Sequence, residues 1–235
     1  MTTAPQIVCV ASTMRSGSTL LKALLAESED VSNLPEQNFQ KFVGDDQAAE
    51  TIARLDEHPI IVLKRPGWYN ETNSYPRIPS VEGLKTIVLI RDCYDTVESL
   101  RKMTFRRLSG LVSRFTNGWL AKHYWAGMTR SLLELHDDPT HETLLVRYED
   151  LTARPLEETA RMFDFIGSSQ KMGVDSYSKP EDFRWRWGSD DNSDNIKSLT
   201  VQARTAKPQT HQALVELIES NEQINQLRKR AGYLQ

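Results

Sequence analysis

The sequence has few cysteines and no familiar metal-ligand spacing. Only Cys9 and Cys93 occur among its 235 residues, and neither a CxxC pair nor a His-rich cluster accompanies them. Two cysteines make no disulfide framework, so we expect neither a disulfide-stapled fold nor a bound metal. Both lie in or beside apolar runs and are interpreted as small buried residues. A reactive thiolate at Cys93, beside the start of a predicted helix, is the alternative.

The chain also lacks a basic excess and a long apolar segment. Lys and Arg number 29 against 32 Asp and Glu, which gives a net charge of −3. The electrostatic signature of a nucleic-acid binder is therefore missing. No stretch approaches the roughly 18–20 apolar residues of a spanning helix, and the N-terminus does not resemble a signal peptide. We expect a cytoplasmic protein without a nucleic-acid partner or an integral membrane segment.

Short apolar runs alternate with segments of helical periodicity. Buried strands are predicted at 6–11, 59–64, 85–90 and 143–147, with a shorter one at 31–34. Helices are predicted at 18–28, 46–57, 93–104, 156–166 and 208–231, and over 106–136 with a break near Gly118. This alternation predicts an α/β fold with a central parallel sheet flanked by helices on both faces, of the P-loop nucleotide-binding type. We expect a single domain over 1–235.

A phosphate-binding turn is indicated between the first strand and the first helix. The residues STMRSGST place Gly17, Ser18 and Thr19 where the helix begins, and a helix N-terminus offers unpaired N–H donors to an anion. The turn differs from the GxxxxGK[ST] motif of nucleoside triphosphatases. Ser18 occupies the position of the lysine, and Arg15 supplies the cation instead. The turn suits a mononucleotide 5′-phosphate, although a Ser/Gly-rich turn without a ligand remains the alternative.

A second anion site is indicated at the end of the third strand. Arg91 follows the run IVLI, and Ser99 lies eight residues further on, about two helical turns along. Ligands of open α/β sheets bind at the carboxyl ends of the strands. Taken alone, Arg91 is better interpreted as a surface residue beside a helix cap at Asp92. A ligand with two separated phosphates accounts for both sites together.

The two motifs resemble those of the sulfotransferases that depend on 3′-phosphoadenosine-5′-phosphosulfate (PAPS). The matching segments are MRSGSTLL (14–21), IRDCYDTVES (90–99) and LLVRYEDLTARP (144–155). The resemblance implies that Arg15, Ser16, Gly17, Ser18 and Thr19 bind the 5′-phosphosulfate. It implies further that Arg91 and Ser99 bind the 3′-phosphate and that Tyr148 lies beside the adenine. The RSGST form is closer to the carbohydrate, tyrosylprotein and bacterial glycolipid branches than to the cytosolic phenol branch.

The same resemblance suggests the catalytic groups. Lys64 matches the strand-end lysine that stabilises the leaving group, with Arg15 beside it. The histidine that cytosolic members carry two residues later is absent, because Pro66 stands there. Glu36, shortly before Phe39, is therefore the predicted general base. Each also has a plain interpretation, as a loop carboxylate for Glu36 and as a solvated strand terminus for Lys64.

The late cofactor-closing loop and the acceptor pocket are less sharply marked. Candidates for the loop are Ser198, Thr200, Arg204 and Lys207. Aromatic residues that fit either an acceptor pocket or core packing are Trp68, Tyr69, Tyr75, Phe183, Trp185 and Trp187. We expect sulfuryl transfer from PAPS to a hydroxyl of a small-molecule or carbohydrate acceptor. The alternatives are a P-loop kinase of small molecules and a non-catalytic nucleotide-binding module.

Overall fold

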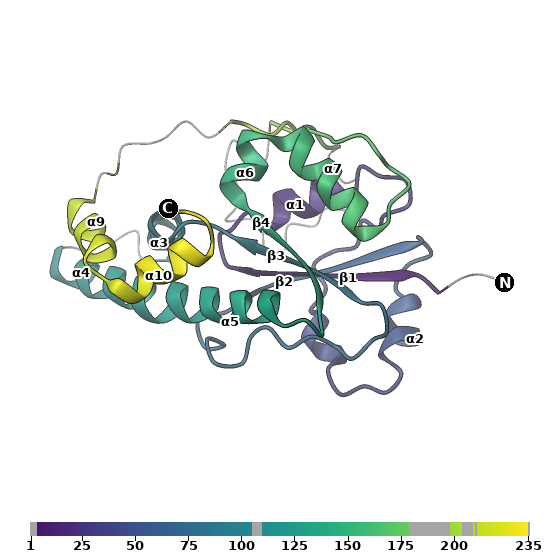
Figure 1. Ribbon diagram of the computed structural model, residues 1–235, viewed down its shortest axis with the longest axis horizontal. Coiled ribbons are helices and arrows are strands. Elements are labelled where there is room, and N and C mark those ends of the chain that lie inside the picture. The colour runs from purple at the N-terminus through teal and green to yellow at the C-terminus, as the bar shows by residue number, and fades with distance from the viewer. Residues whose placement is uncertain (1–3, 105–109, 179–197, 204–208, 210, 235) are drawn as a thin grey trace.

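A four-stranded parallel sheet organises the chain (Figure 1). The computed structural model describes residues 4–104, 110–178, 198–203, 209 and 211–234, without the side chains of 104–114. The strands are β1 (Gln6–Thr13), β2 (Ile60–Gly67), β3 (Lys85–Ile90) and β4 (Glu142–Arg147), in the order β2-β1-β3-β4. β2 follows β1 in the chain and pairs with one of its edges, whereas β3 pairs with the other edge, so the strand order reverses at β1. This reversal beside β1 is where open α/β sheets bind ligands, outside the carboxyl ends of the strands.

Helices cover both faces of the sheet (Figure 1). One face carries α1 (Ser18–Leu25), α6 (Tyr148–Ala153) and α7 (Pro155–Ile166). The other carries α2 (Ala48–Ala53), α3 (Cys93–Thr104), η2 (Leu120–Trp125), α5 (Ala126–Asp137), α9 (Gln212–Glu219) and α10 (Glu222–Arg230). The short η1 (Phe39–Phe42) and α4 (Gly110–Trp119) complete the described elements. The predicted fold class is confirmed.

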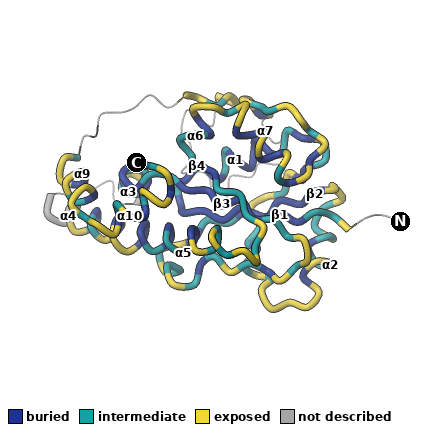
Figure 2. The backbone as a smooth tube through the Cα atoms, in the orientation of Figure 1, coloured by how far each residue is buried: buried dark blue, intermediate teal, exposed yellow. Residues whose placement is uncertain are grey.

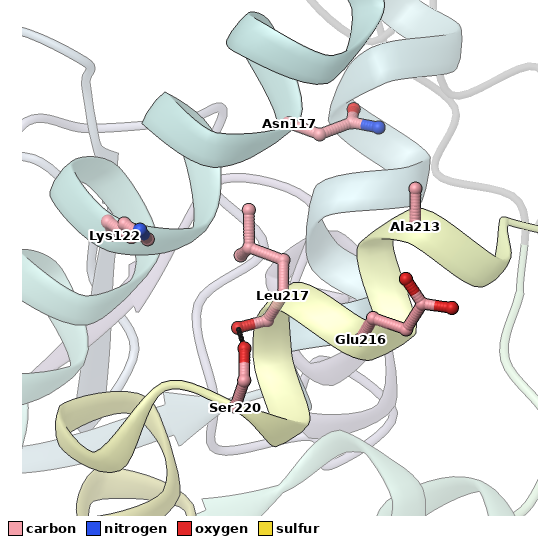
Figure 3. Close-up of a pocket in the computed structure, with 6 residues that line it drawn as sticks. All are labelled: Asn117, Lys122, Ala213, Glu216, Leu217 and Ser220. Atoms are coloured by element: carbon pink, nitrogen blue, oxygen red, sulfur yellow. Dashed lines mark hydrogen bonds between the residues drawn. The ribbon is translucent and has the colours of Figure 1, made fainter.

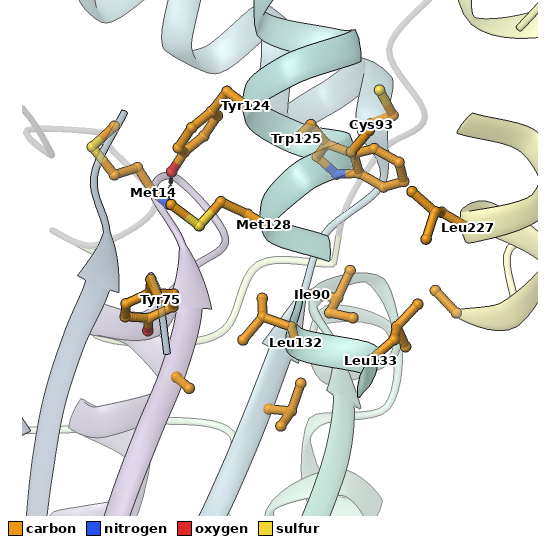
Figure 4. Packing of buried hydrophobic residues seen from close by; sticks show 14 of the residues in the cluster. Met14, Tyr75, Ile90, Cys93, Tyr124, Trp125, Met128, Leu132, Leu133 and Leu227 are labelled. Carbon is orange, nitrogen blue, oxygen red and sulfur yellow. Dashed lines mark hydrogen bonds between the residues drawn. The ribbon is translucent and has the colours of Figure 1, made fainter. Parts of the chain in front are cut away.

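Two hydrophobic clusters lie on opposite faces of the sheet, because successive strand residues alternate between them. On β1, Cys9 packs in the cluster beneath α5, whereas Val8 and Val10 pack in the cluster beneath α1. The strands and the inner helix faces are accordingly buried (Figure 2). Figure 4 shows the cluster on the face of the sheet that α5 covers, with Trp125 and Leu132 in it. Among the described residues, no helix is both long enough and apolar enough to cross a bilayer.

Burial also settles the state of the cysteines. Cys9 and Cys93 are fully buried, and burial raises the pKa of both thiols well above the usual value. Cys93 begins α3, where a helix N-terminus favours a thiolate. The loss of solvent around the buried thiol has the larger effect on its pKa. The interpretation as small core residues holds, and the reactive alternative for Cys93 is wrong.

Several predicted boundaries differ from the structure. The strand expected at 31–34 is a single parallel bridge from Val31 to Ile60, because the Ser32 hydroxyl, rather than the backbone, accepts the Val62 amide. The predicted break near Gly118 is a π-helical segment, η2, that begins two residues later and keeps the chain helical into α5. The helix expected over 208–231 is two helices. The Asn221 side chain accepts from the Ile224 amide and caps a second helix, which begins at Glu222.

Candidate active site

The turn between β1 and α1 has the backbone conformation expected of an anion-binding turn. Arg15 and Gly17 both have left-handed backbone angles, with φ of 64° and 89°. They curl the chain so that α1 begins at Ser18, with Gly17 as its N-cap. The buried Ser16 hydroxyl donates to the Thr13 carbonyl at 2.9 Å and fixes the turn from inside. The first amides of α1 have no partner within the helix and are free for an anion at this end.

Two buried tyrosines hold the turn against β2. The Tyr124 hydroxyl accepts from the Met14 amide at 2.7 Å (Figure 4). It donates to the Gly67 carbonyl, also at 2.7 Å. The Tyr75 hydroxyl accepts from the Ser12 amide at 2.8 Å and donates to the Arg65 carbonyl at 2.6 Å. The ends of β1 and β2 are thereby locked together. Tyr75 therefore packs in the core and is not an acceptor contact.

The two predicted anion sites meet at the adjacent ends of β1 and β3. Arg15 Nε donates to Ser99 Oγ at 3.0 Å, and Arg91 donates to the Arg15 carbonyl at 2.9 Å. The Arg91 guanidinium lies over the Tyr148 ring, 4.4 Å from its centroid. The Arg91 carbonyl is itself fixed by the Trp125 indole, 2.9 Å away. Residues from three motifs, far apart in sequence, thus form one cluster with two guanidinium groups at the ends of β1 and β3.

Gly17 and Tyr148 are in close contact at this cluster. A Cβ atom on Gly17 would lie 2.3 Å from Cδ2 and 2.5 Å from Cε2 of the tyrosine ring. No side chain fits between them, so the glycine is required by the ring as well as by its positive φ. The resemblance places the adenine beside Tyr148, and this contact brings that ring to the mouth of the phosphate turn.

Lys64 and Glu36 lie together beside the start of α1. Lys64 Nζ donates to Glu36 Oε2 at 2.7 Å and to Thr19 Oγ1 at 3.1 Å. The Lys64 side chain is only 7% exposed, whereas that of Glu36 is 40% exposed. A buried ammonium at the phosphate turn and an accessible carboxylate next to it are suited to stabilising a leaving oxygen and accepting a proton.

Sequence reasoning missed a second lysine in this region. Lys22 on α1 is buried, and its Nζ donates to Asn33 Oδ1 at 3.4 Å. Burial and the nearby positive charge of Lys64 lower the pKa of Lys22 to about 8, although Glu36 opposes the shift. The signal that could have identified Lys22 is its position four residues after Ser18, which places both residues on the same face of α1.

A domain-family comparison and structural comparisons agree with this geometry. The model of the sulfotransferase domain matches residues 5–184, most of the chain. The chain belongs to the sulfotransferase-domain family. The resemblance inferred from the three motifs is confirmed. A search of curated protein sequences finds no significant match.

Solved sulfotransferase structures share the fold at low sequence identity. The sulfotransferase domain of the curacin biosynthetic pathway aligns over 100% of both chains at 19% identity, with a TM-score of 0.56. The sulfotransferase domain of the Synechococcus PCC 7002 olefin synthase aligns over 93% of this chain and 95% of its own at 17% identity, with a TM-score of 0.58. A sulfotransferase from Alicyclobacillus acidocaldarius aligns over 77% and 88% at 13% identity, with a TM-score of 0.50.

Of the other predicted residues of this sulfotransferase, some are described by the structure and some are not. Ser198 and Thr200 are exposed, and Thr200 pairs with Ser176 in an isolated antiparallel bridge beyond α7. Arg204, Lys207, Phe183, Trp185 and Trp187 lie outside the described residues. Trp68 is 38% exposed, whereas Tyr69 packs on Tyr124 with ring centroids 5.0 Å apart.

A separate hollow lies between α4, η2 and α9 (Figure 3). Its volume is about 360 Å³, and Asn117, Lys122, Ala213, Glu216, Leu217 and Ser220 line it. None of the predicted donor or catalytic residues is among them. The proposed chemistry is therefore assigned to the cluster at the strand ends and not to this hollow.

Proposed function

We propose that the protein transfers a sulfuryl group from PAPS to a hydroxyl of a small-molecule or carbohydrate acceptor, including a glycolipid. The observation that carries this proposal is the convergence of Arg15, Ser99 and Arg91 in one cluster beside the phosphate turn. Two guanidinium groups on neighbouring strand ends suit a nucleotide with two separated phosphates, since planar guanidinium groups bind phosphate well. Family membership supplies the reaction class, and PAPS is a donor of this form.

The proposed donor orientation follows from the two ends of the cluster. The phosphosulfate lies in the turn of Ser16–Thr19, against the N-terminus of α1. The 3′-phosphate lies at Arg91 and Ser99, and the adenine lies beside Tyr148. Each contact uses a group that the fold already holds in place, so little ordering is needed when the donor binds.

The transfer is proposed to proceed in line. The acceptor oxygen bonds to sulfur as the bond from sulfur to the bridging oxygen breaks, and the electron pair of that bond stays on the phosphate of the leaving adenosine-3′,5′-bisphosphate. Glu36 accepts the proton of the acceptor hydroxyl. Lys64 and Arg15 stabilise the charge that develops on the bridging oxygen. Positioning and electrostatics supply the catalysis, as in phosphoryl transfer.

Ligand-dependent thermal stability tests the donor assignment. Adenosine-3′,5′-bisphosphate without Mg²⁺ should raise Tm, because a ligand at 100 times its Kd stabilises the folded state by about 2.7 kcal/mol. ATP with Mg²⁺ should raise it much less. The reverse order would favour the kinase alternative and reject the proposal.

A transfer screen then tests the reaction itself. ³⁵S-labelled PAPS is offered with sugars, glycolipids, phenols and tyrosine peptides, and labelled products are separated from free sulfate. Transfer to a sugar or other small-molecule hydroxyl supports the proposed acceptor class. Label found only on peptide tyrosines would contradict it. Binding of the bisphosphate without transfer to any acceptor would favour the non-catalytic module.

A further inference from the structure

The segment Asn33–Glu36 is held between two buried lysines. Lys64, on β2, donates to Glu36 Oε2 at 2.7 Å at the end of the segment. Lys22, on α1, makes a longer contact of 3.4 Å to Asn33 Oδ1 at its beginning. The two lysines are 6% and 5% exposed, whereas Asn33 and Glu36 are exposed. Leu34, between them, packs against the hydrophobic core and fixes the backbone of the segment, so the polar contacts act on the two exposed side chains.

The reaction makes conflicting demands on Lys64. In the structure its ammonium contacts both Glu36 and Thr19. In the proposed transfer the same ammonium stabilises the leaving oxygen, and Glu36 must be free to accept a proton. In that mechanism Lys64 turns away from Glu36 toward the donor. The buried Ser32 and the packed Leu34 still hold the backbone of the segment. A second anchor is then needed for its exposed side chains, Asn33 and Glu36.

We propose that Lys22 is this anchor, a positioning residue that holds the segment Asn33–Glu36 against α1 while Lys64 binds the donor. The inference rests on the function proposed above and deepens it. Lys22 does not touch the reacting atoms. It acts through Asn33 on the position of Glu36.

The charge on Lys22 gives the anchor a pH dependence. The charged groups acting on it are Lys64 from β2 and Glu36 from the loop, and burial is the largest influence, lowering its pKa to about 8. Because this pKa is below the usual 10.5, the ammonium is present below pH 8 and is lost as the pH rises through 8. Guanidinium stays charged over this range, so Lys22→Arg is the variant that removes the dependence.

Hydrogen–deuterium exchange of peptides covering 31–40 tests the anchor without an acceptor. The protein is saturated with adenosine-3′,5′-bisphosphate, and Lys22→Met and Asn33→Ala are each compared with wild type. Both variants should exchange roughly 3- to 10-fold faster in this segment, the effect of one lost hydrogen bond. Asn33→Asp should exchange no faster than wild type, because its carboxylate still pairs with Lys22. Lys41→Met, an exposed lysine of the following turn, is the control and should change nothing.

Kinetics separate positioning from a purely structural role. PAPS turnover, measured as release of the bisphosphate with water or the acceptor from the screen, should show a lower kcat in Lys22→Met at unchanged affinity for the bisphosphate. In wild type, kcat/KM for PAPS should fall as the pH rises through about 8, and Lys22→Arg should lack this fall.

The possible failures are distinguishable. Unchanged exchange and kcat in both Lys22→Met and Asn33→Ala, with the bisphosphate bound, would overturn the anchor and leave the donor assignment intact. Asn33→Ala changes an exposed side chain, so a folding defect in Lys22→Met alone does not decide the matter. Failure of the wild type to bind the bisphosphate would overturn the proposed function, and this inference with it.

Discussion

Replacement of Gly17 by alanine isolates the contact on which the proposed donor site depends. The residue has φ of 89°, and the new Cβ would lie 2.3 Å from the Tyr148 ring. A left-handed backbone costs an L-residue about 1–2 kcal/mol, and overpacking a fitted site costs typically about 1–3 kcal/mol more. We expect Gly17→Ala to lower the free energy of unfolding by about 2–5 kcal/mol, measured by urea denaturation.

Gly44 provides a matched control. Its φ is 79°, and a Cβ added there would meet nothing within 4 Å. Gly44→Ala therefore carries the backbone cost of about 1–2 kcal/mol alone. The difference between the two variants measures the collision with the ring. In a Tyr148→Ala background this difference should disappear, and the double-mutant cycle gives the coupling directly.

Donor binding reports the same displacement independently. The Arg91 guanidinium lies 4.4 Å from the centroid of the Tyr148 ring, so a ring pushed from Gly17 disturbs the second anion site. Calorimetry should show that Gly17→Ala weakens adenosine-3′,5′-bisphosphate binding about tenfold or more, equivalent to at least about 1.4 kcal/mol, whereas Gly44→Ala leaves it unchanged. Equal losses of stability and affinity in the two variants would refute the reasoning.

Three further substitutions probe the donor site, the base and the acid stability of the fold. Arg91→Ala should weaken bisphosphate binding roughly 10- to 150-fold in calorimetry, because bonds to charged groups contribute about 1.5–3 kcal/mol; unchanged affinity would rule out the second anion site. Glu36→Gln should keep that affinity and lower kcat by about 10²–10⁴-fold; full turnover would remove Glu36 from the mechanism. Burial would raise the pKa of Asp30, but hydrogen bonds from Ser169, Ser28 and Ser168 lower it to about 2. Its stabilising contribution is present above the usual pKa near 3.8 and is lost as the pH falls toward 2, so Asp30→Asn should flatten the acid dependence of the urea midpoint; an unflattened curve would contradict this.

The fold was largely predictable because its strands are buried on both faces. Segments such as 85–90 read as unbroken apolar runs, and β3 occupies these residues. The strand expected at 31–34 was wrong because a side-chain hydroxyl took over one ladder bond, and no sequence period signals that exchange. The division of the last helix depends on the cap at Asn221, a residue type that favours helix N-caps, so this boundary was readable from the sequence but was missed.

The candidate site was predictable where the backbone determines it. Arg15 and Arg91 follow parallel strands, and such strand ends share one edge of the sheet. Lys22 and Tyr124 were missed for a different reason. A lysine on a short helix normally faces water, whereas Lys22 is 5% exposed. Tyr124 comes from a distant helix, so its bond to the Met14 amide depends on how that helix packs.

The two halves of the site are held in different ways, and this has a consequence for function. The donor half consists of backbone angles, strand ends and buried hydroxyls, such as the Tyr124 contact to Met14 and Gly67. The proposed base lies instead on a loop whose exposed side chains, Asn33 and Glu36, are fixed by lysines. A change in the core is expected to reach the proposed donor turn. A change in this loop acts first on Glu36 and, through their contact, on Lys64. We therefore expect loop variants to lower kcat more than they weaken binding of the bisphosphate.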